Sequence, residues 1–463
     1  MPITGAFIMP HPPIILPQVG RGEEEKIRKT INSCEKIAEQ IAEIRPETIV
    51  LASPHSLIYS DYFHISQGLR AKGNMRKFGV SEDKFQINVE YDCDFASNLQ
   101  EEAERHGIAA GMIGEQDPYL DHGTTVPLAF IHQRFPDYKL VLIGISGFSR
   151  TEHYKFGMCI AKVADILNKN VVFLASGDLS HKASHQSHYG FAVEGVMFDE
   201  QVTEAMKNGD FMKFLTFDGT MTEKAAECGL RSFIIMAGAL DGKEVKSELL
   251  SYENTFGIGY GVASFIPKGE NNDRKFLDVF KKLENLRLKE IQTKEDEYVK
   301  LARYSIETYI NTGRISDLPK SVPEEMLLRR AGVFVTLKKH GSLRGCIGTI
   351  SPESKSIANE ILMNAVSAAT HDPRFEPVKT SELSEIEYSV DVLSAPEPID
   401  STDSLDSKRY GIIVTSGHKR GLLLPNLEGV DNVEQQIKIA CRKAGIRDDE
   451  TFNIERFEVT RHH

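Results

Sequence analysis

The stretch FIMPHPPIILPQVG, residues 7–20, ends a short apolar run and places a histidine between prolines. Proline fixes its own φ and disfavours the helical conformation of the residue before it, so Pro12 pushes His11 into an extended conformation. The run ITGAFIM (residues 3–9) is short and mostly apolar, which predicts a buried strand. His11 therefore follows directly after a strand, in a loop of restricted conformation.

Strand-like and helix-like segments alternate through the first 267 residues. Apolar residues recur every three or four positions between residues 27 and 44, which is typical of one face of an amphipathic helix. Further strand candidates are TIVLAS (48–53), KLVLIGI (139–145) and NVVFLAS (170–176). Because alternating strands and helices are typical of layered folds, we expect an α/β N-terminal domain with a mixed sheet flanked by helices.

Length and composition limit the class of protein. A chain of 463 residues with 41% hydrophobic content is expected to form two or three domains with ordinary cores. The net charge of −12 opposes general binding to nucleic acid or anionic membranes. We see no signal peptide and no apolar run near the roughly 18 residues of a membrane span. The six cysteines lie far apart and predict reduced thiols, so we expect a cytoplasmic protein.

The polar run PKGENNDRK (267–275) and the charged helical stretch after it indicate a domain boundary. We therefore expect a first domain over residues 1–267, a linker and helix over 268–289, and a second domain over 290–463. The second domain mixes strand-like runs such as GVFVTLKK with helical runs such as SIANEILMNAVSAAT. This pattern predicts an α+β fold.

Histidines follow several of the predicted strands of the first domain. His11 and His55 each lie two residues beyond a strand and each follows a proline, while His181 follows a later strand in FLASGDLSH. In open α/β sheets, ligands bind beyond the carboxyl ends of the strands. The matched positions of His11 and His55 indicate a metal site, although a hydrogen-bonded structural role is the alternative for any single histidine.

Two neighbouring residues are candidates for the third metal ligand, Glu227 and Cys228. Both belong to the stretch KAAECGLRSFIIMAGAL (224–240). Adjacent helical residues point about 100° apart, so usually only one of them reaches the metal. Glu227 would complete a two-histidine, one-carboxylate site suited to Fe(II) and O2, whereas a Cys228 thiolate would favour zinc or copper. Alternatively, Glu227 is a charge favoured by a helix N-terminus.

Five motifs resemble the class III extradiol ring-cleavage dioxygenases of the B-subunit type over residues 3–266, a superfamily that includes the Memo proteins. They are MPHPPI (9–14), SPH (53–55), DHGTTVPL (121–128), SGDLSH (176–181) and SYENTFGIGYGVASF (251–265). The resemblance implies that His11, His55 and Glu227 bind Fe(II), with His181 as the acid/base. It makes His122 either a residue that supports the metal ligands or a group that orients the substrate. In the Memo pattern, Cys228 takes the place of Glu227.

Motifs of the second domain resemble the AMMECR domain over about residues 290–460. They are LRGCIGT (343–349), HDPRF (371–375), EYSVDVLS (387–394) and RGLLLP (420–425). From the residues themselves, Cys346 is a candidate nucleophile with His371 as its partner, and Arg344 or Arg374 would bind an anion. The alternative is a small cysteine packed in a strand.

These features lead to three functional hypotheses. The first is an Fe(II)-dependent dioxygenase that uses O2 to open a catecholic or aminophenolic ring, with an AMMECR domain that binds the substrate or a partner. The second is a Memo-like metal-binding scaffold that works with a partner, such as the radical-SAM protein that the resemblance implies. The third is a Zn hydrolase using the same histidines. A homodimer is expected from the relatives of the first domain, and neither nucleic acid nor membrane is an expected partner.

Overall fold

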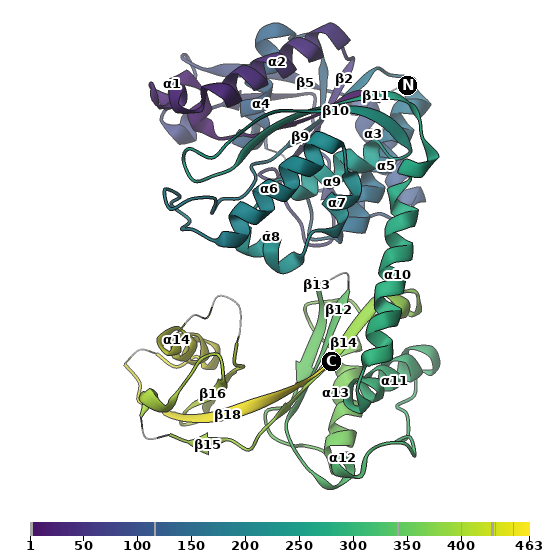
Figure 1. The fold of residues 1–463 in the computed structure, drawn as a ribbon, viewed down its shortest axis with the longest axis vertical. Coiled ribbons are helices and arrows are strands. Elements are labelled where there is room, and N and C mark those ends of the chain that lie inside the picture. Colours follow the sequence, from purple (N-terminus) through teal and green to yellow (C-terminus); the bar gives the residue numbers. More distant parts are fainter. Residues whose placement is uncertain are drawn as a thin grey trace. The chain divides into compact units, whose positions relative to one another are not determined.

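The computed structural model describes residues 3–114, 117–339, 342–399, 401–426, 430, 432–447 and 449–463. The chain divides into two compact units, Met1–Lys282 and Leu283–His463, which are described separately below (Figure 1). The division falls within helix α10 (Phe276–Lys294), in the segment that the sequence assigns to a linker and helix.

A nine-stranded sheet forms the centre of the N-terminal unit, in the order β10-β11-β1-β9-β2-β8-β5-β4-β7. Strands β1, β9, β2, β8 and β5 run parallel to one another, whereas β4 pairs antiparallel with β5, and β11 and β10 add an antiparallel edge on the other side. The sheet is therefore mixed, as the sequence predicts. Its strands are β1 (Ile3–Met9), β2 (Thr48–Ser53), β4 (Arg70–Asn74), β5 (Gln86–Tyr91), β7 (Tyr119–Leu120), β8 (Lys139–Gly144), β9 (Val171–Ser176), β10 (Lys243–Glu253) and β11 (Tyr260–Glu270).

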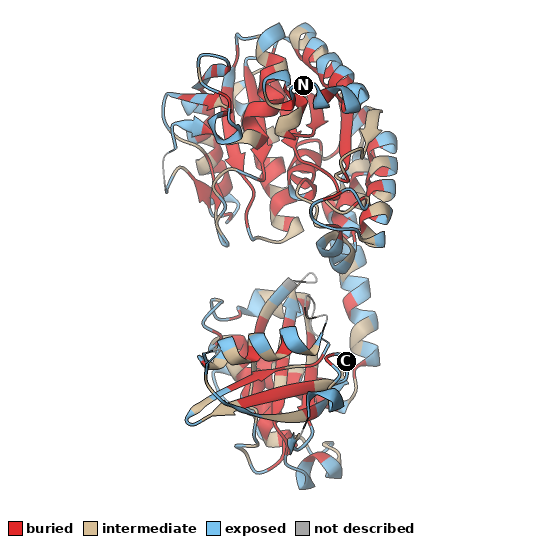
Figure 2. Ribbon diagram, turned by 90° about the vertical axis from the view of Figure 1, so that its left-hand side faces the viewer, coloured by how far each residue is buried: buried red, intermediate tan, exposed pale blue. Residues whose placement is uncertain are grey.

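Helices cover both faces of this sheet, because successive residues of a strand point to opposite faces. On β1, Phe7 and Met9 pack into one core, while Ala6 and Ile8 pack into the other. The first core contains α2 (Arg28–Ile44) and α4 (His122–Arg134). The second contains α3 (Cys93–Arg105), α5 (Arg150–Leu167), α6 (Val193–Asn208) and α9 (Leu230–Ala239). The central strands are buried on both sides (Figure 2), which explains their continuous apolar sequences.

The C-terminal unit is built on an antiparallel sheet with the strand order β13-β12-β14-β18-β16-β17. Helices α11 (Glu297–Thr312) and α13 (Ile357–Thr370) share a core with β12 and β14, while α14 (Val433–Ala444) packs on β16 and β17. This is the expected α+β architecture. The strands are β12 (Val333–Lys339), β13 (Ser342–Gly348), β14 (Ile386–Leu393), β16 (Tyr410–Ser416), β17 (Lys419–Leu423) and β18 (Asn453–His462).

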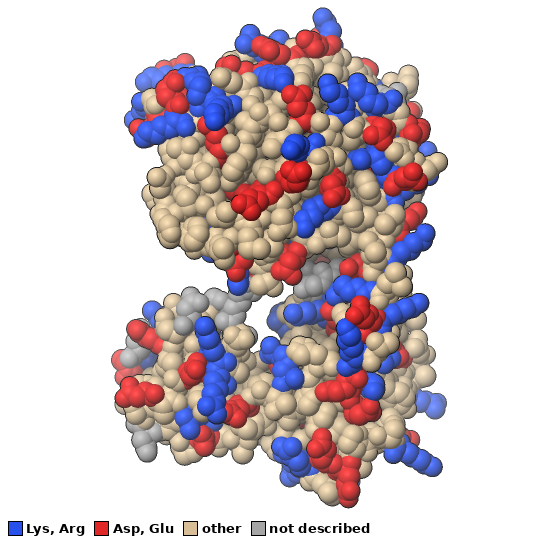
Figure 3. Space-filling model, in the orientation of Figure 1, with Lys and Arg blue, Asp and Glu red and all other residues tan. Residues whose placement is uncertain are grey.

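Acidic and basic side chains are intermingled on the face of each unit seen in Figure 3. The net charge of −12 is the difference between 67 acidic and 55 basic residues, so both signs of charge are expected on the surface. Within the described part of the chain, none of the helices combines the length and apolar character needed to cross a membrane.

Candidate metal centre

Three neighbouring strands end side by side at one edge of the N-terminal sheet. Strand β9 lies between β1 and β2, and the parallel register pairs Met9 with Ser176 and Ala52 with Ala175. The loops that leave these strands therefore begin at one level. His11 and His55 each follow their strand by two residues, so the sheet brings them together although they are far apart in the sequence.

His11 is held in place by the loop that follows β9. Its backbone N–H donates a hydrogen bond to Oδ1 of Asp178 at 2.9 Å, and only 1% of the residue is exposed. Its Nδ1 lies 2.8 Å from Oγ of Ser176. That hydroxyl donates its own proton to the carbonyl of Gly123 at 2.5 Å, so it accepts a hydrogen from His11 Nδ1. Nε2 of His11 consequently carries the lone pair.

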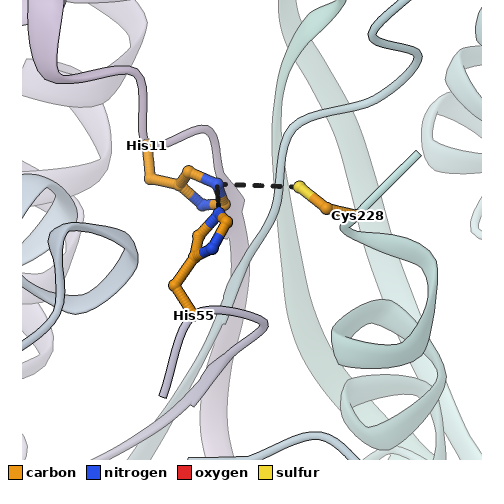
Figure 4. A group of neighbouring side chains, drawn as sticks. All are labelled: His11, His55 and Cys228. Atoms are coloured by element: carbon orange, nitrogen blue, oxygen red, sulfur yellow. Dashed lines mark hydrogen bonds between the residues drawn. The ribbon is translucent and has the colours of Figure 1, made fainter. Parts of the chain in front are cut away.

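The lone pair of His11 faces His55 and Cys228 (Figure 4). The two Nε2 atoms are 3.0 Å apart, and Sγ of Cys228 lies 3.6 Å from Nε2 of His11. All three ligand atoms lie within 4.8 Å of one another. Around a tetrahedral metal with bonds of about 2.0–2.1 Å to nitrogen and about 2.3 Å to sulfur, ligand atoms are about 3.3–3.6 Å apart. The residues therefore fit a metal ion.

Glu227, the other candidate for the third ligand, lies outside this group. Its Oε2 accepts a hydrogen bond from the backbone N–H of Leu230 at 2.7 Å, at the first residue of α9. A carboxylate is favoured there because the first N–H groups of a helix lack partners within the helix. The structure thus brings together His11, His55 and Cys228, and uses Glu227 at the start of the helix.

The other two predicted histidines also lie at the cluster. The ring of His122, the first residue of α4, is 4.1 Å from that of His55 and 5.5 Å from that of His11. His181 is near enough for its charge to lower the pKa of His11, and its ring stacks on Tyr189. Burial lowers the pKa of both His122 and His181 to about 4, so both are neutral at pH 7.

Cys228 and Asp178 are also affected by burial. Burial, with the nearby charges of Asp178 and Glu227, raises the pKa of the Cys228 thiol well above its usual range. Burial raises the pKa of Asp178 to about 7, and its Oδ2 lies 3.8 Å from Nε2 of His11. A bound cation would reverse both shifts, because it stabilises a neighbouring thiolate or carboxylate.

Sequence reasoning did not assign roles to Ser176 and Asp178. Both belong to the motif SGDLSH, in which only His181 was singled out. Ser176 is the last residue of β9, and Asp178 lies two residues beyond it, just as His11 and His55 lie two residues beyond β1 and β2. This shared position in the sequence could have identified both residues.

A cavity of about 680 Å³ borders the cluster on the side of His55 and His122. Its wall comes from the segments after β2, β4 and β7, together with side chains of β5 and β8. Its volume lies in the range of small-molecule sites.

The second-domain candidates lie on and beside β13. The backbone N–H of Cys346 donates to Oδ2 of Asp372 at 2.8 Å, and Thr336 donates its hydroxyl to Sγ of Cys346 at 3.2 Å. Arg374 binds Asp372 through Nε and Nη2, and Nη2 also donates to the carbonyl of Cys346. The ring of His371 is exposed and is hydrogen-bonded to Thr370, its neighbour in the chain.

Ion pairs dominate the electrostatics of this second cluster. Hydrogen bonds from Arg374 lower the pKa of Asp372 to about 2. Burial alone would raise the pKa of Glu382. The hydrogen bonds from Arg344, at 3.0 and 2.9 Å, the backbone hydrogen bond from Lys379 and the charges of Lys339 and Arg344 together outweigh burial, and the pKa falls to about 2. The cluster therefore contains charged groups that neutralise one another.

Comparison with known proteins agrees with both domains. Residues 5–263 match the family model of the catalytic LigB subunit of aromatic ring-opening dioxygenase, and residues 299–462 match the AMMECR1 model. A Clostridium acetobutylicum protein is 42% identical over all of this chain and 99% of its own length. A Thermotoga maritima protein is 53% identical over 36% of this chain and 98% of its own length.

Two solved structures also show similarity. An uncharacterised protein of Pyrococcus horikoshii is 34% identical over 35% of this chain and 88% of its own, with a TM-score of 0.33. An uncharacterised protein of Escherichia coli K12 is 16% identical over 57% of this chain and 99% of its own, with a TM-score of 0.39.

Proposed function

Because the chain belongs to the family of the catalytic LigB subunit of aromatic ring-opening dioxygenase and continues into an AMMECR1 domain, we propose that its N-terminal unit binds one transition-metal ion through His11, His55 and Cys228. The observation that carries this proposal is the convergence of two imidazole nitrogens and one sulfur. Sulfur is a soft ligand that favours zinc and copper, so we propose Zn or Cu as the metal in place of Fe(II).

The surrounding residues have distinct parts in this proposal. Ser176 fixes the tautomer of His11, and Asp178 holds the loop that carries it. His122 and His181, being neutral, can accept a proton from a ligand of the metal. A bound zinc would supply a Lewis acid, and a bound copper an electron-transfer centre. In this function the unit acts with a partner, for which a radical-SAM protein is our proposal.

Metal content tests the ligand set. Wild type, Cys228→Ala and Glu227→Gln are each reconstituted anaerobically with Fe(II), Zn(II) or Cu(I), and bound metal is measured after desalting. We expect one equivalent of zinc or copper in wild type and in Glu227→Gln, which keeps an acceptor for the N–H of Leu230, and loss of it in Cys228→Ala. Loss only in Glu227→Gln, with a preference for Fe(II), would overturn the proposal.

A second candidate, the Fe(II)-dependent dioxygenase, is supported by the cavity beside His55 and His122 and by the proximity of His181 to the cluster. It predicts O2 uptake with a catecholic or aminophenolic compound by the iron-loaded chain. His181→Ala should abolish this uptake while iron content stays unchanged. Absence of O2 uptake by iron-loaded wild type with both classes of compound would reject this candidate.

A further inference from the structure

Tyr189, in the loop between β9 and α6, lies against His181, the histidine beside the metal cluster. The two rings are stacked, with centroids 5.0 Å apart and an interplanar angle of 24°. Near-parallel stacking at this separation is a favourable arrangement of two rings. Because 60% of Tyr189 is exposed, its ring adds little to the hydrophobic core, and its position needs another explanation.

The backbone of His181 is fixed on both sides. Its N–H donates to the carbonyl of Ala225 at 3.0 Å, and its carbonyl accepts a hydrogen bond from the hydroxyl of Ser187. The oxygen of the same hydroxyl accepts the backbone N–H of Tyr189 at 3.1 Å. Ser187 therefore links the backbones of the two residues whose rings are stacked.

The β10–β11 hairpin holds Ser187 in place. The backbone N–H of Ala183 donates to the carbonyl of Gly257 at 2.9 Å, so the loop is hydrogen-bonded to the hairpin. A Cβ atom on Gly257 would lie 2.3 Å from the backbone nitrogen of Ser187, and Gly257 has a φ of +77°. Only glycine allows the two segments to approach so closely in this conformation. The packing of the hairpin thus sets the position of Tyr189.

The ring of His181 is oriented differently from that of His11. Ser176 fixes the ring of His11 through a hydrogen bond to Nδ1, whereas neither ring nitrogen of His181 is hydrogen-bonded to a described residue. A general base must keep a nitrogen lone pair available for the proton it accepts. Stacking sets the plane of the ring without using either nitrogen.

A second ring pair on the same loop provides a comparison. Phe191 lies on His185, with ring centroids 4.3 Å apart, and both residues are exposed. A ring contact on this loop therefore does not by itself bury a histidine. His181, in contrast, is buried enough for its pKa to fall to about 4, and the ring of Tyr189 covers one of its faces.

We propose that Tyr189 is a positioning residue, which holds the ring of His181 at the metal cluster by stacking and keeps water from its outer face. The proposal rests on the proposed function in one respect, since it takes His181 as the group that accepts a proton from a ligand of the metal. Tyr189 acts only through His181 and is not itself a proton acceptor.

Chemical modification of His181 tests the proposal on the full chain. Diethyl pyrocarbonate acylates neutral imidazoles that solvent can reach. Trypsin releases residues 170–182, in which His181 is the only histidine, so mass spectrometry of this peptide gives the rate for that residue alone. Wild type, Tyr189→Ala, Tyr189→Phe and Phe191→Ala are compared, each zinc-loaded and metal-free.

The stack predicts a different pH profile for one variant. In wild type the rate should change little between pH 5.5 and 7.5, because a pKa of about 4 keeps His181 neutral throughout. Tyr189→Ala should react about fivefold faster at pH 7.5 and more slowly at pH 5.5 than at pH 7.5, because an exposed imidazole has a pKa nearer 6.5. Tyr189→Phe keeps the stacked ring and Phe191→Ala leaves it untouched, so both should behave as wild type.

An unchanged rate and profile in Tyr189→Ala would overturn the proposal, and so would the same change in Tyr189→Phe or Phe191→Ala. The melting temperature should be equal in all four proteins, because both aromatic rings are exposed. A fall in melting temperature only in Tyr189→Ala would make Tyr189 structural and reject the proposal. Absence of bound zinc in wild type would instead reject the proposed metal site, while the metal-free comparison would still decide whether Tyr189 covers His181.

Discussion

The cluster at His11 and the cluster at Cys346 contain similar kinds of residue but use their polar atoms in opposite ways. In the first, burial lowers the pKa values of His11 and His55 and so favours their neutral forms. Their ring nitrogens and the sulfur of Cys228 lie close together. In the second, Asp372 and Glu382 are each held by an arginine and remain charged. Two imidazoles and a thiol that converge on one point can share a metal ion, whereas charges that are already paired have no need of a ligand. We therefore expect the first cluster to bind and the second to stabilise.

The largest effect that would sharpen this contrast comes from Ser176→Ala. This change removes the acceptor that fixes the Nδ1–H tautomer of His11, so the lone pair of Nε2 is no longer held toward the metal. Loss of such a second hydrogen-bond partner typically weakens metal affinity by about 10–100-fold. Competition with a chelator of known affinity measures the change.

Ser180→Ala is the matched control for this prediction. Ser180 belongs to the same motif and is fully buried, but its hydroxyl donates to the carbonyl of Ala225 and does not contact His11. Equal loss of affinity in the two variants would show that the loop as a whole, and not the tautomer of His11, controls binding.

A smaller effect is expected from Asp372→Ala in the second cluster. The change leaves the N–H of Cys346 and the guanidinium of Arg374 without their shared acceptor, which should lower the free energy of unfolding of the C-terminal unit by about 2 kcal/mol. Hydrogen exchange at β13 reports this loss, and the metal content of the chain should not change.

Glu376→Ala changes an exposed carboxylate four residues away and should have little effect on exchange at β13. If Asp372→Ala left exchange at β13 unchanged but altered metal content, the division into a binding cluster and a stabilising cluster would be wrong.

The smallest effect is a pH dependence of metal affinity. Binding requires the thiolate of Cys228, whose pKa is raised in the metal-free chain, so the thiolate fraction increases tenfold for each pH unit below that pKa. His11 and His55 have lowered pKa values and stay neutral above pH 7.5, where Asp178, with a pKa of about 7, is mostly ionised. The dissociation constant should therefore fall about tenfold per pH unit between pH 7.5 and 8.5.

Metal-buffer titrations at three pH values measure this slope. Cys228→Ser should bind more weakly and show a smaller slope, since a serine hydroxyl does not ionise in this range. A wild-type affinity that does not change with pH would exclude the thiol as a ligand.

Much of the N-terminal site could be predicted because its signals are local. His11 and His55 follow short apolar runs and are each preceded by proline, and both the runs and the prolines can be read from the sequence alone. The choice between Glu227 and Cys228 could not be made in this way. The two residues are neighbours, and only the start of α9, which uses the Glu227 carboxylate, separates their environments.

The sequence by itself determined the two families, the α/β and α+β folds and the histidines at the ends of the strands, because periodicity and short motifs are properties of neighbouring residues. Only the tertiary structure decided which side chains meet. Cys228 lies 217 positions from His11 in the chain, and Ser176 lies 165 positions from it, yet parallel pairing of β1 with β9 brings the latter within hydrogen-bonding distance.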